Sequence, residues 1–115
     1  MDTAIMSASG IRGIVGSSLD ASMLTQFSTA FGTFLTLAPY RSEHDERGQT
    51  NLRKAVVVGR DSRMSGEMVY HSVLAGLIAT GCLVIDVGLC PTPTILLMAK
   101  ELNTHGSVAI TASHN

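Results

Sequence analysis

The sequence predicts an α/β protein of one domain, residues 1–115, in which a mostly parallel sheet lies between helices as a three-layer α/β/α arrangement. After residue 54, strand-like and helix-like segments alternate in the order strand, helix, strand, helix, strand. These strands are almost entirely apolar, which is typical of strands covered on both faces. The chain is 45% hydrophobic and 15% charged, so it has enough apolar material for a core. Such alternation predicts parallel strands joined by right-handed crossovers.

The N-terminal part is expected to contain a glycine-rich loop followed by a long helix. Residues 4–16 hold three glycines and one arginine, which indicates a loop between short extended pieces. A helix is predicted from about Asp20, with Ser18 or Asp20 capping its first turn and Pro39 stopping it. We expect it to cover one face of the sheet through an apolar stripe made of Met23, Leu24, Phe27, Ala30, Phe31, Phe34 and Leu35.

The two later helices are crossovers between the predicted parallel strands. The first is expected to have Ser65 as its cap and to end near Thr80, where Gly81 stops it. The second is expected to have Thr92 as its cap and Pro93 as its first helical residue. The strands themselves are predicted at residues 55–58, 83–87 and 107–110.

Composition and charge exclude several classes of protein. The net charge is −1 with no basic block, which argues against nucleic-acid binding by a charged face. No apolar run reaches the roughly 18 residues of a membrane span, and the N-terminus lacks the features of a signal peptide, so a cytoplasmic location is expected. Cys82 and Cys90 match no zinc or redox spacing and are predicted to be buried free thiols. Residues 41–51 have no apolar member and are interpreted as a plain exposed loop rather than as a charged partner-binding segment.

Polar residues follow each of the three predicted strands. In open α/β sheets, ligands bind beyond the carboxyl ends of the strands, and those ends lie at one edge of a parallel sheet. The segments that leave this edge are residues 59–63, 88–92 and 111–115. We therefore expect their polar side chains to gather on one rim.

The chemical character of this rim indicates phosphate. Arg60, Arg63 and, if the first loop folds over, Arg12 supply guanidinium groups that suit phosphate oxygens. Ser113 supplies a hydroxyl beside His114, and a serine near arginines and a histidine suggests phosphoryl transfer through a covalent phosphoserine. Thr111, His114 and Asn115, with backbone N–H groups of the turn, are candidates to hold the phosphate oxygens.

Each of these residues also has a structural interpretation. Ser-His-Asn after a strand is an ordinary turn, and Arg60 with Asp61 is equally consistent with a surface ion pair. A hydrolase triad is poorly supported because no carboxylate motif orients His114. Asp86 is either a buried, hydrogen-bonded carboxylate or a residue facing a strand edge, and it receives no catalytic role. The remaining histidines are interpreted as structural: His44, His71 and His105.

Four segments of the sequence resemble motifs of one enzyme family, the α-D-phosphohexomutases. The segment at residues 9–16 resembles the family's S-G-I-R-G loop, and the one at 58–66 resembles V-G-R-D-x-R-x-S-G. Residues 92–94 resemble its T-P segment, and 111–115 resemble its T-A-S-H-N active-serine loop. The four occur in the family's order and at similar separations, across nearly the whole chain.

The resemblance implies a phosphosugar mutase, an isomerase that works as an intramolecular phosphotransferase of carbohydrate metabolism. Phosphoglucomutase, phosphomannomutase and phosphoglucosamine mutase belong to this family. A phosphate on Ser113 would pass to a hexose 1- or 6-phosphate, the bisphosphorylated sugar would reorient, and its other phosphate would return to the serine. Hexose 1,6-bisphosphate would thus be both the intermediate and the activator. Mg²⁺ would bind the phosphate on Ser113 and screen its charge during transfer.

The resemblance also implies roles for single residues. Arg12 would steady the transferring phosphoryl group, and His114 would shape the serine loop. Ser9, Thr111 and Asn115 would contact the substrate. Arg60, Asp61 and Arg63 would order the loop nearby.

Family members are several times longer than this chain, and later domains supply three carboxylates for Mg²⁺, the sugar-recognition loop and the grip on the second phosphate. We therefore expect this chain to be an incomplete first domain that has no mutase activity by itself. Its expected partners are a phosphorylated hexose and the remaining mutase domains of the parent chain. Any sheet edge left exposed would favour self-association. The alternative function is a non-catalytic module that binds a phosphosugar or phosphate. A purely structural domain would require four ordered motif matches by chance.

Overall fold

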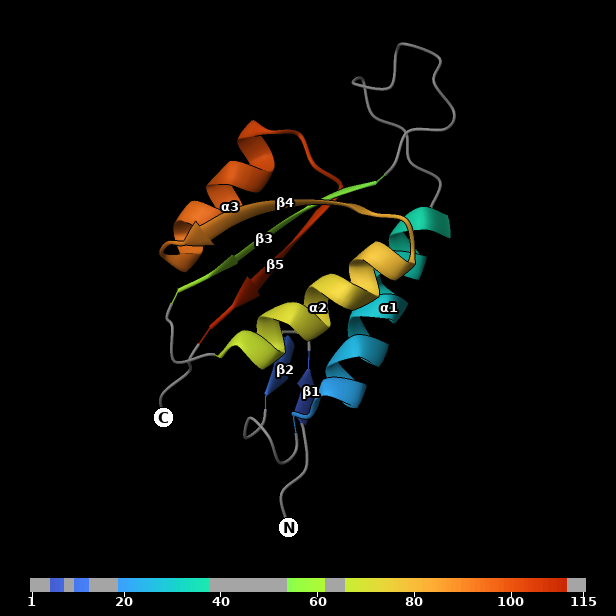
Figure 1. Cartoon of the computed structure of the whole chain (residues 1–115). Helices are drawn as coiled ribbons and strands as arrows, with labels where there is room; N and C mark the ends of the chain where they lie inside the picture. The colour runs from blue at the N-terminus through green and yellow to red at the C-terminus, as the bar shows by residue number, and fades with distance from the viewer. Residues whose placement is uncertain (1–4, 8–9, 13–18, 38–53, 62–65, 112–115) are drawn as a thin grey trace.

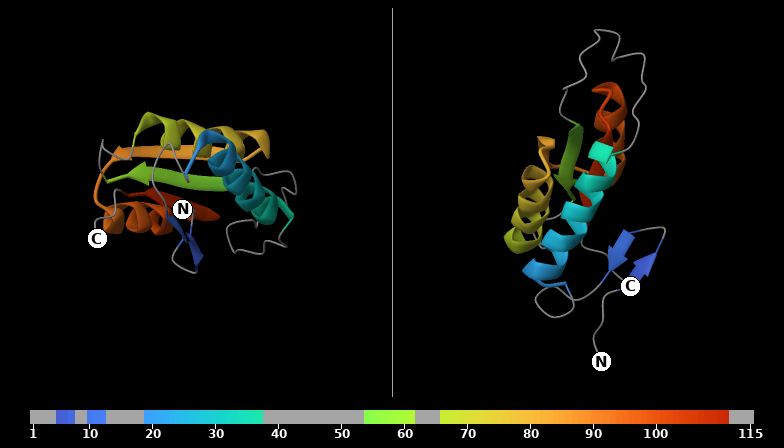
Figure 2. Two further views of the ribbon diagram at one scale, coloured as in Figure 1. Left: turned by 90° about the horizontal axis from the view of Figure 1, so that it is seen from below. Right: turned by 90° about the vertical axis from the view of Figure 1, so that its right-hand side faces the viewer.

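The computed structural model describes residues 5–7, 10–12, 19–37, 54–61 and 66–111. Their main feature is a three-stranded parallel sheet in which β3 (Ala55–Arg60) lies between β4 (Leu83–Leu89) and β5 (Gly106–Ile110). Helices lie on both faces of this sheet: α1 (Ala21–Leu37) and α2 (Glu67–Ala79) on one, α3 (Thr92–Glu101) on the other (Figure 1). The predicted α/β/α fold is therefore confirmed: Figure 1 shows the strands between α3 on one side and α1 and α2 on the other, and the view from below in Figure 2 shows β3 between β4 and β5.

The central strand forms the core because it is apolar and covered on both faces. Val56, Val57 and Val58 are fully buried. Val56 and Val58 belong to a cluster with residues of α1 and α2. Since side chains alternate along a strand, Val57 and Gly59 face α3 on the other side of the sheet. The interpretation of apolar strands as doubly covered holds for β3 but is wrong for β4, an edge strand whose Leu83 and Leu89 are exposed.

Each strand extends beyond its predicted bounds, and for β3 the reason lies at Gly59. The sequence places the end of the first strand at this glycine, yet β3 continues to Arg60. A Cβ atom on Gly59 would lie 2.7 Å from Ile95 Cγ1 and 2.8 Å from Val87 Cγ2. The glycine therefore marks the close approach of α3 to the sheet, not the end of the strand.

The two helices on the first face pack closely through small residues. Ser28 Oγ of α1 donates a hydrogen bond to the carbonyl oxygen of Ser72 in α2 at 3.3 Å. A Cβ atom on Gly76 would lie 2.7 Å from the carbonyl oxygen of Thr25, and one on Gly32 would strike the side chain of Thr80. α1 also reaches the sheet at Gly106, where Phe31 and Leu35 approach.

This close packing corrects the predicted apolar stripe of α1. Leu24 and Leu35 are buried as expected, but Phe34 is 68% exposed and Ala30 is exposed. The face that meets α2 is built around Ser28 and Gly32, because large side chains would hold the two helix backbones apart.

The caps of the helices were predicted with mixed success. Asp20 Oδ1 accepts a hydrogen bond from the N–H of Met23 at 2.8 Å, so Asp20 caps α1 as expected. The cap position of α2 is Gly66, with no side-chain cap bond, whereas Ser65 lies outside the described residues, as does Pro39. The cap of α3 is Pro91 rather than Thr92, because the first helical N–H groups, those of Thr94 and Ile95, donate to the Pro91 carbonyl oxygen.

The N-terminal residues form a separate two-stranded sheet. β1 (Ile5–Ser7) pairs antiparallel with β2 (Gly10–Arg12), so that Ile5 lies opposite Arg12. These are the short extended pieces that the sequence predicts around the glycine-rich loop. No helix in the described part of the chain is long and apolar enough to cross a membrane. The predicted loop at 41–51, with His44, lies outside the described residues.

Candidate functional site at the carboxyl edge of the sheet

The three polar segments predicted to meet do start from neighbouring strand ends. Arg60, the last residue of β3, pairs with Leu89 of β4 on one side and with Ile110 of β5 on the other. The Asp61 N–H donates to the carbonyl oxygen of Ile110 at 3.1 Å, and the Cys90 N–H donates to that of Arg60 at 2.9 Å. The arrows of β3, β4 and β5 accordingly end on the same side of the molecule in Figure 1.

The predicted site residues divide into those that the structure describes and those that it does not. Arg60 is half-buried, and Asp61 and Thr111 are exposed at this edge. Arg12 ends β2, and only its backbone is described. The others lie outside the described residues, and their roles stay predictions: Ser9, Arg63, Ser113, His114 and Asn115.

Arg60 is held against an aromatic ring that the sequence interpretation did not include. Its guanidinium carbon lies 4.7 Å from the ring centroid of Tyr70, which is a cation–π geometry. Tyr70 belongs to the first turn of α2, where its N–H donates to the carbonyl oxygen of Gly66 at 3.4 Å. The His71 ring also lies against Tyr70 in a T-shaped arrangement, with the ring centroids 5.1 Å apart. The start of α2 thus places an aromatic platform beside the end of β3.

The hydroxyl of Tyr70 connects this platform to β4. It donates a hydrogen bond to Asp86 Oδ2, and Asp86 Oδ1 accepts a second one from the N–H of Gly88 at 2.7 Å. Asp86 is therefore an exposed, hydrogen-bonded carboxylate on the edge strand, which combines parts of the two alternatives left open by the sequence. A carboxylate in an otherwise apolar strand was a signal for a partner, but nothing in the sequence pointed to Tyr70.

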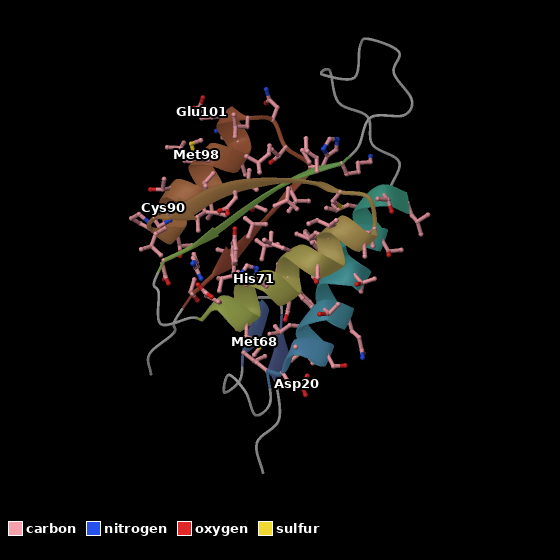
Figure 3. The ribbon with its side chains drawn as sticks, viewed as in Figure 1. Asp20, Met68, His71, Cys90, Met98 and Glu101 are labelled. Atoms are coloured by element: carbon pink, nitrogen blue, oxygen red, sulfur yellow. The ribbon has the colours of Figure 1, made fainter. Side chains whose placement is uncertain are left out.

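The cysteines and the remaining described histidines do not add reactive groups to this arrangement. Cys82 is buried, as predicted, whereas Cys90 is only half-buried because it follows the last residue of the edge strand (Figure 3). His105 Nδ1 accepts a hydrogen bond from the Ala55 N–H at 3.0 Å, at the amino end of β3, which agrees with a structural interpretation. His71 is exposed, and its ring lies against Tyr70 in a T-shaped arrangement.

The described residues do not form a metal site by themselves. Among them, no group of three or more His, Cys, Asp or Glu side chains lies close enough together to hold a metal ion. Both oxygens of the Asp86 carboxylate accept protein hydrogen bonds, so this group is already committed to the link between α2 and β4.

Comparison with known proteins identifies the family. Residues 3–115 match the family model described as phosphoglucomutase/phosphomannomutase, alpha/beta/alpha domain I. A phosphoglucomutase/phosphomannomutase of Thermococcus kodakarensis is 41% identical over 106 residues, which cover 92% of this chain and 21% of that protein. A phosphoglucosamine mutase of Rhodococcus erythropolis is 37% identical, with 92% and 22% covered. A probable phosphoglucosamine mutase of Pyrococcus furiosus is 39% identical, with 93% and 20% covered.

The chain spans about a fifth of the length of these curated relatives. The matched region includes the three strand ends and all four motifs that the sequence analysis singled out. With the parallel sheet and its helices on both faces, the match gives one conclusion: this chain belongs to the phosphoglucomutase/phosphomannomutase family, and its residues 3–115 correspond to the family's α/β/α domain I.

Proposed function

We propose that the chain is the serine-bearing domain of a phosphosugar mutase, which interconverts a hexose 1-phosphate and the corresponding 6-phosphate. One observation carries this proposal: Arg60 is paired with Ile110, and the Asp61 N–H is bonded to the Ile110 carbonyl oxygen at 3.1 Å. The described chain after Ile110 therefore starts directly beside Asp61, and Ser113 follows three residues later in the sequence. Family membership supports the same assignment.

The proposed reaction transfers one phosphoryl group at a time. A free hydroxyl of the hexose monophosphate attacks the phosphorus on Ser113, the bond from phosphorus to Ser113 Oγ breaks, the sugar hydroxyl loses its proton, and Oγ regains one. After the bisphosphorylated sugar has reoriented, Ser113 Oγ loses its proton and attacks the other phosphorus. The bond from that phosphorus to the sugar oxygen breaks, and the sugar oxygen takes up a proton, which releases the isomeric monophosphate. Charge builds on the phosphoryl oxygens during each transfer, so positioned guanidinium groups would stabilise it.

The roles of this chain's residues follow from their proposed places around that phosphate. Arg12 would steady the transferring group, and His114 would shape the serine loop beside the sugar. Ser9, Thr111 and Asn115 would donate to or accept from the substrate. Mg²⁺ would supply charge neutralisation at the phosphate on Ser113, and the described residues do not by themselves form a complete site for it.

The sugar is proposed to be a glucose, mannose or glucosamine phosphate, the three sugars that the names of the relatives mention. In the longer mutase that contains this domain, Ser113→Ala should abolish conversion of whichever of the three the parent protein converts, because no other group would carry the phosphate. Lys100→Ala, at an exposed position of α3 outside the four motifs, is the control for handling and folding. Near-normal turnover by the Ser113→Ala protein would eliminate the phosphoserine mechanism.

A further inference from the structure

We infer that Tyr70 and Asp86 are positioning residues that hold Arg60 at the rim for phosphoryl transfer; this inference rests on the proposed function. Three elements supply the group: β3 ends in Arg60, α2 begins with the turn that contains Tyr70, and β4 contains Asp86. None of the four sequence motifs includes Tyr70 or Asp86.

The first part of the arrangement fixes the side chain of Arg60. Its guanidinium carbon lies 4.7 Å from the Tyr70 ring centroid, and both residues are half-buried. A guanidinium group stacked on a ring loses part of its rotamer freedom before any anion binds, and its planar N–H groups keep a defined direction. The Tyr70 ring is itself held by its hydroxyl, which donates to Asp86 Oδ2.

The second part fixes the backbone on which Arg60 lies. The pairing of β3 with β4 shifts register between Val58 and Gly59, because Asp86 pairs with Val58 whereas Gly88 pairs with Gly59. Val87 is the extra residue of this bulge. Gly88 has a φ of 73°, and its N–H donates to Asp86 Oδ1 across the bulge at 2.7 Å.

After the bulge, β4 pairs with β3 again at Arg60. Leu89 pairs with Arg60, and the Cys90 N–H donates to the Arg60 carbonyl oxygen at 2.9 Å. The two oxygens of Asp86 therefore act on Arg60 by separate routes, one through the Tyr70 ring to the side chain and one through the bulge to the main chain. On the other side of Arg60, Ile110 leads into the segment that contains Ser113.

The functional consequence is a preorganised cation beside Ile110, three residues before the proposed phosphate carrier in the sequence. Misplacing a group that stabilises a transferring phosphoryl group slows the transfer itself, because its effect depends on geometry in the transition state. Tyr70→Phe removes the hydroxyl but keeps the ring against Arg60. It therefore distinguishes the effect of the hydrogen bond to Asp86 from the effect of the packing of the ring on Arg60. Asp86→Asn keeps an acceptor oxygen and is the milder variant of the other partner.

The test uses the longer mutase and two readouts. The first is the rate at which hexose 1,6-bisphosphate phosphorylates Ser113 in a single turnover, measured with Arg60→Ala, Tyr70→Phe and the double variant. We expect Tyr70→Phe to lower this rate about fivefold, which corresponds to the loss of roughly one hydrogen bond. In the Arg60→Ala protein the same change should have no further effect, because Tyr70 is proposed to act through Arg60. The exposed Ala75→Ser in the same helix is the matched control and should leave the rate unchanged.

The second readout does not need a functioning enzyme. Hydrogen exchange at the amides of Gly88 and Cys90 should be faster in Asp86→Ala than in the parent protein, with Tyr70→Phe in between. Equal effects of Tyr70→Phe with and without Arg60, or an unchanged phosphorylation rate, would overturn the positioning role while leaving the proposed function intact. If the parent protein itself is never phosphorylated at Ser113, the proposed function fails, and the positioning role fails with it.

Discussion

The backbone N–H of Asp61 donates to the carbonyl oxygen of Ile110, with 3.1 Å between nitrogen and oxygen, although the two residues lie 49 positions apart in the chain. This hydrogen bond continues the pairing of β3 with β5 by one residue at the carboxyl edge of the sheet. It anchors the start of the segment that contains Ser113 to the start of the segment that contains Arg63. The anchor belongs to the backbone, so side-chain changes at either position leave it in place.

Gly76→Ala should destabilise the chain although alanine favours helices. The gain in helix propensity is about 1 kcal/mol, whereas overpacking costs about 1–3 kcal/mol. The new Cβ would lie 2.7 Å from both the Thr25 oxygen and the Thr29 nitrogen, which are backbone atoms of α1 and cannot rotate away. We expect a lower free energy of unfolding by chemical denaturation. The variant Ala75→Gly, at an exposed position of the same helix, measures the difference in helix propensity between alanine and glycine. If Gly76→Ala raised the free energy of unfolding by that same amount, the close packing would be disproved.

Asp20→Ala should weaken the start of α1. The side-chain oxygen that accepts from the Met23 N–H would be lost, which costs about 1 kcal/mol for a typical cap. Asp20→Ser keeps a capping oxygen and should retain most of the stability in the same denaturation measurement. An alanine variant as stable as the serine variant would mean that Asp20 is not the cap.

His105→Ala should loosen the amino end of the sheet. His105 bonds Ala55 twice: its N–H donates to the Ala55 carbonyl oxygen at 2.8 Å, and its Nδ1 accepts from the Ala55 N–H at 3.0 Å. Losing the side-chain acceptor should lower the free energy of unfolding by about 1 kcal/mol. Asn offers an oxygen acceptor, so His105→Asn should recover part of the loss. Faster hydrogen exchange at the Ala55 amide in the alanine variant, but not in the asparagine variant, checks the contact directly.

The order of the elements was predictable because it depends on local patterns. Apolar runs and turn residues separate the three strands from the helices, and Asp20 is a capping residue in front of a periodic segment. Packing was less accessible. Phe34 belongs to the periodic stripe of α1 and is nevertheless exposed, because the approach of α2 selects Ser28 and Gly32 for the contact. From the sequence alone, Gly59 is interpreted as the end of a strand, because the local sequence does not indicate that α3 packs against it.

The site was predictable to the extent that it depends on topology. Parallel strands bring the ends near Arg60, Leu89 and Ile110 together whatever their side chains are. The link from Tyr70 to Asp86 was not predictable, because it joins a helix start to an edge strand 16 residues later through side chains alone. A tyrosine in a first turn has many possible partners, and only the fold selects one.

The central claim, that Ser113 carries the phosphate, is tested most directly by mass spectrometry of the longer mutase before and after incubation with hexose 1,6-bisphosphate. We predict that the protein gains one phosphoryl group, located by peptide mapping on Ser113, and that the Ser113→Ala variant gains none. A protein that turns over hexose phosphates without phosphate on Ser113, or with it on another residue, would contradict the account.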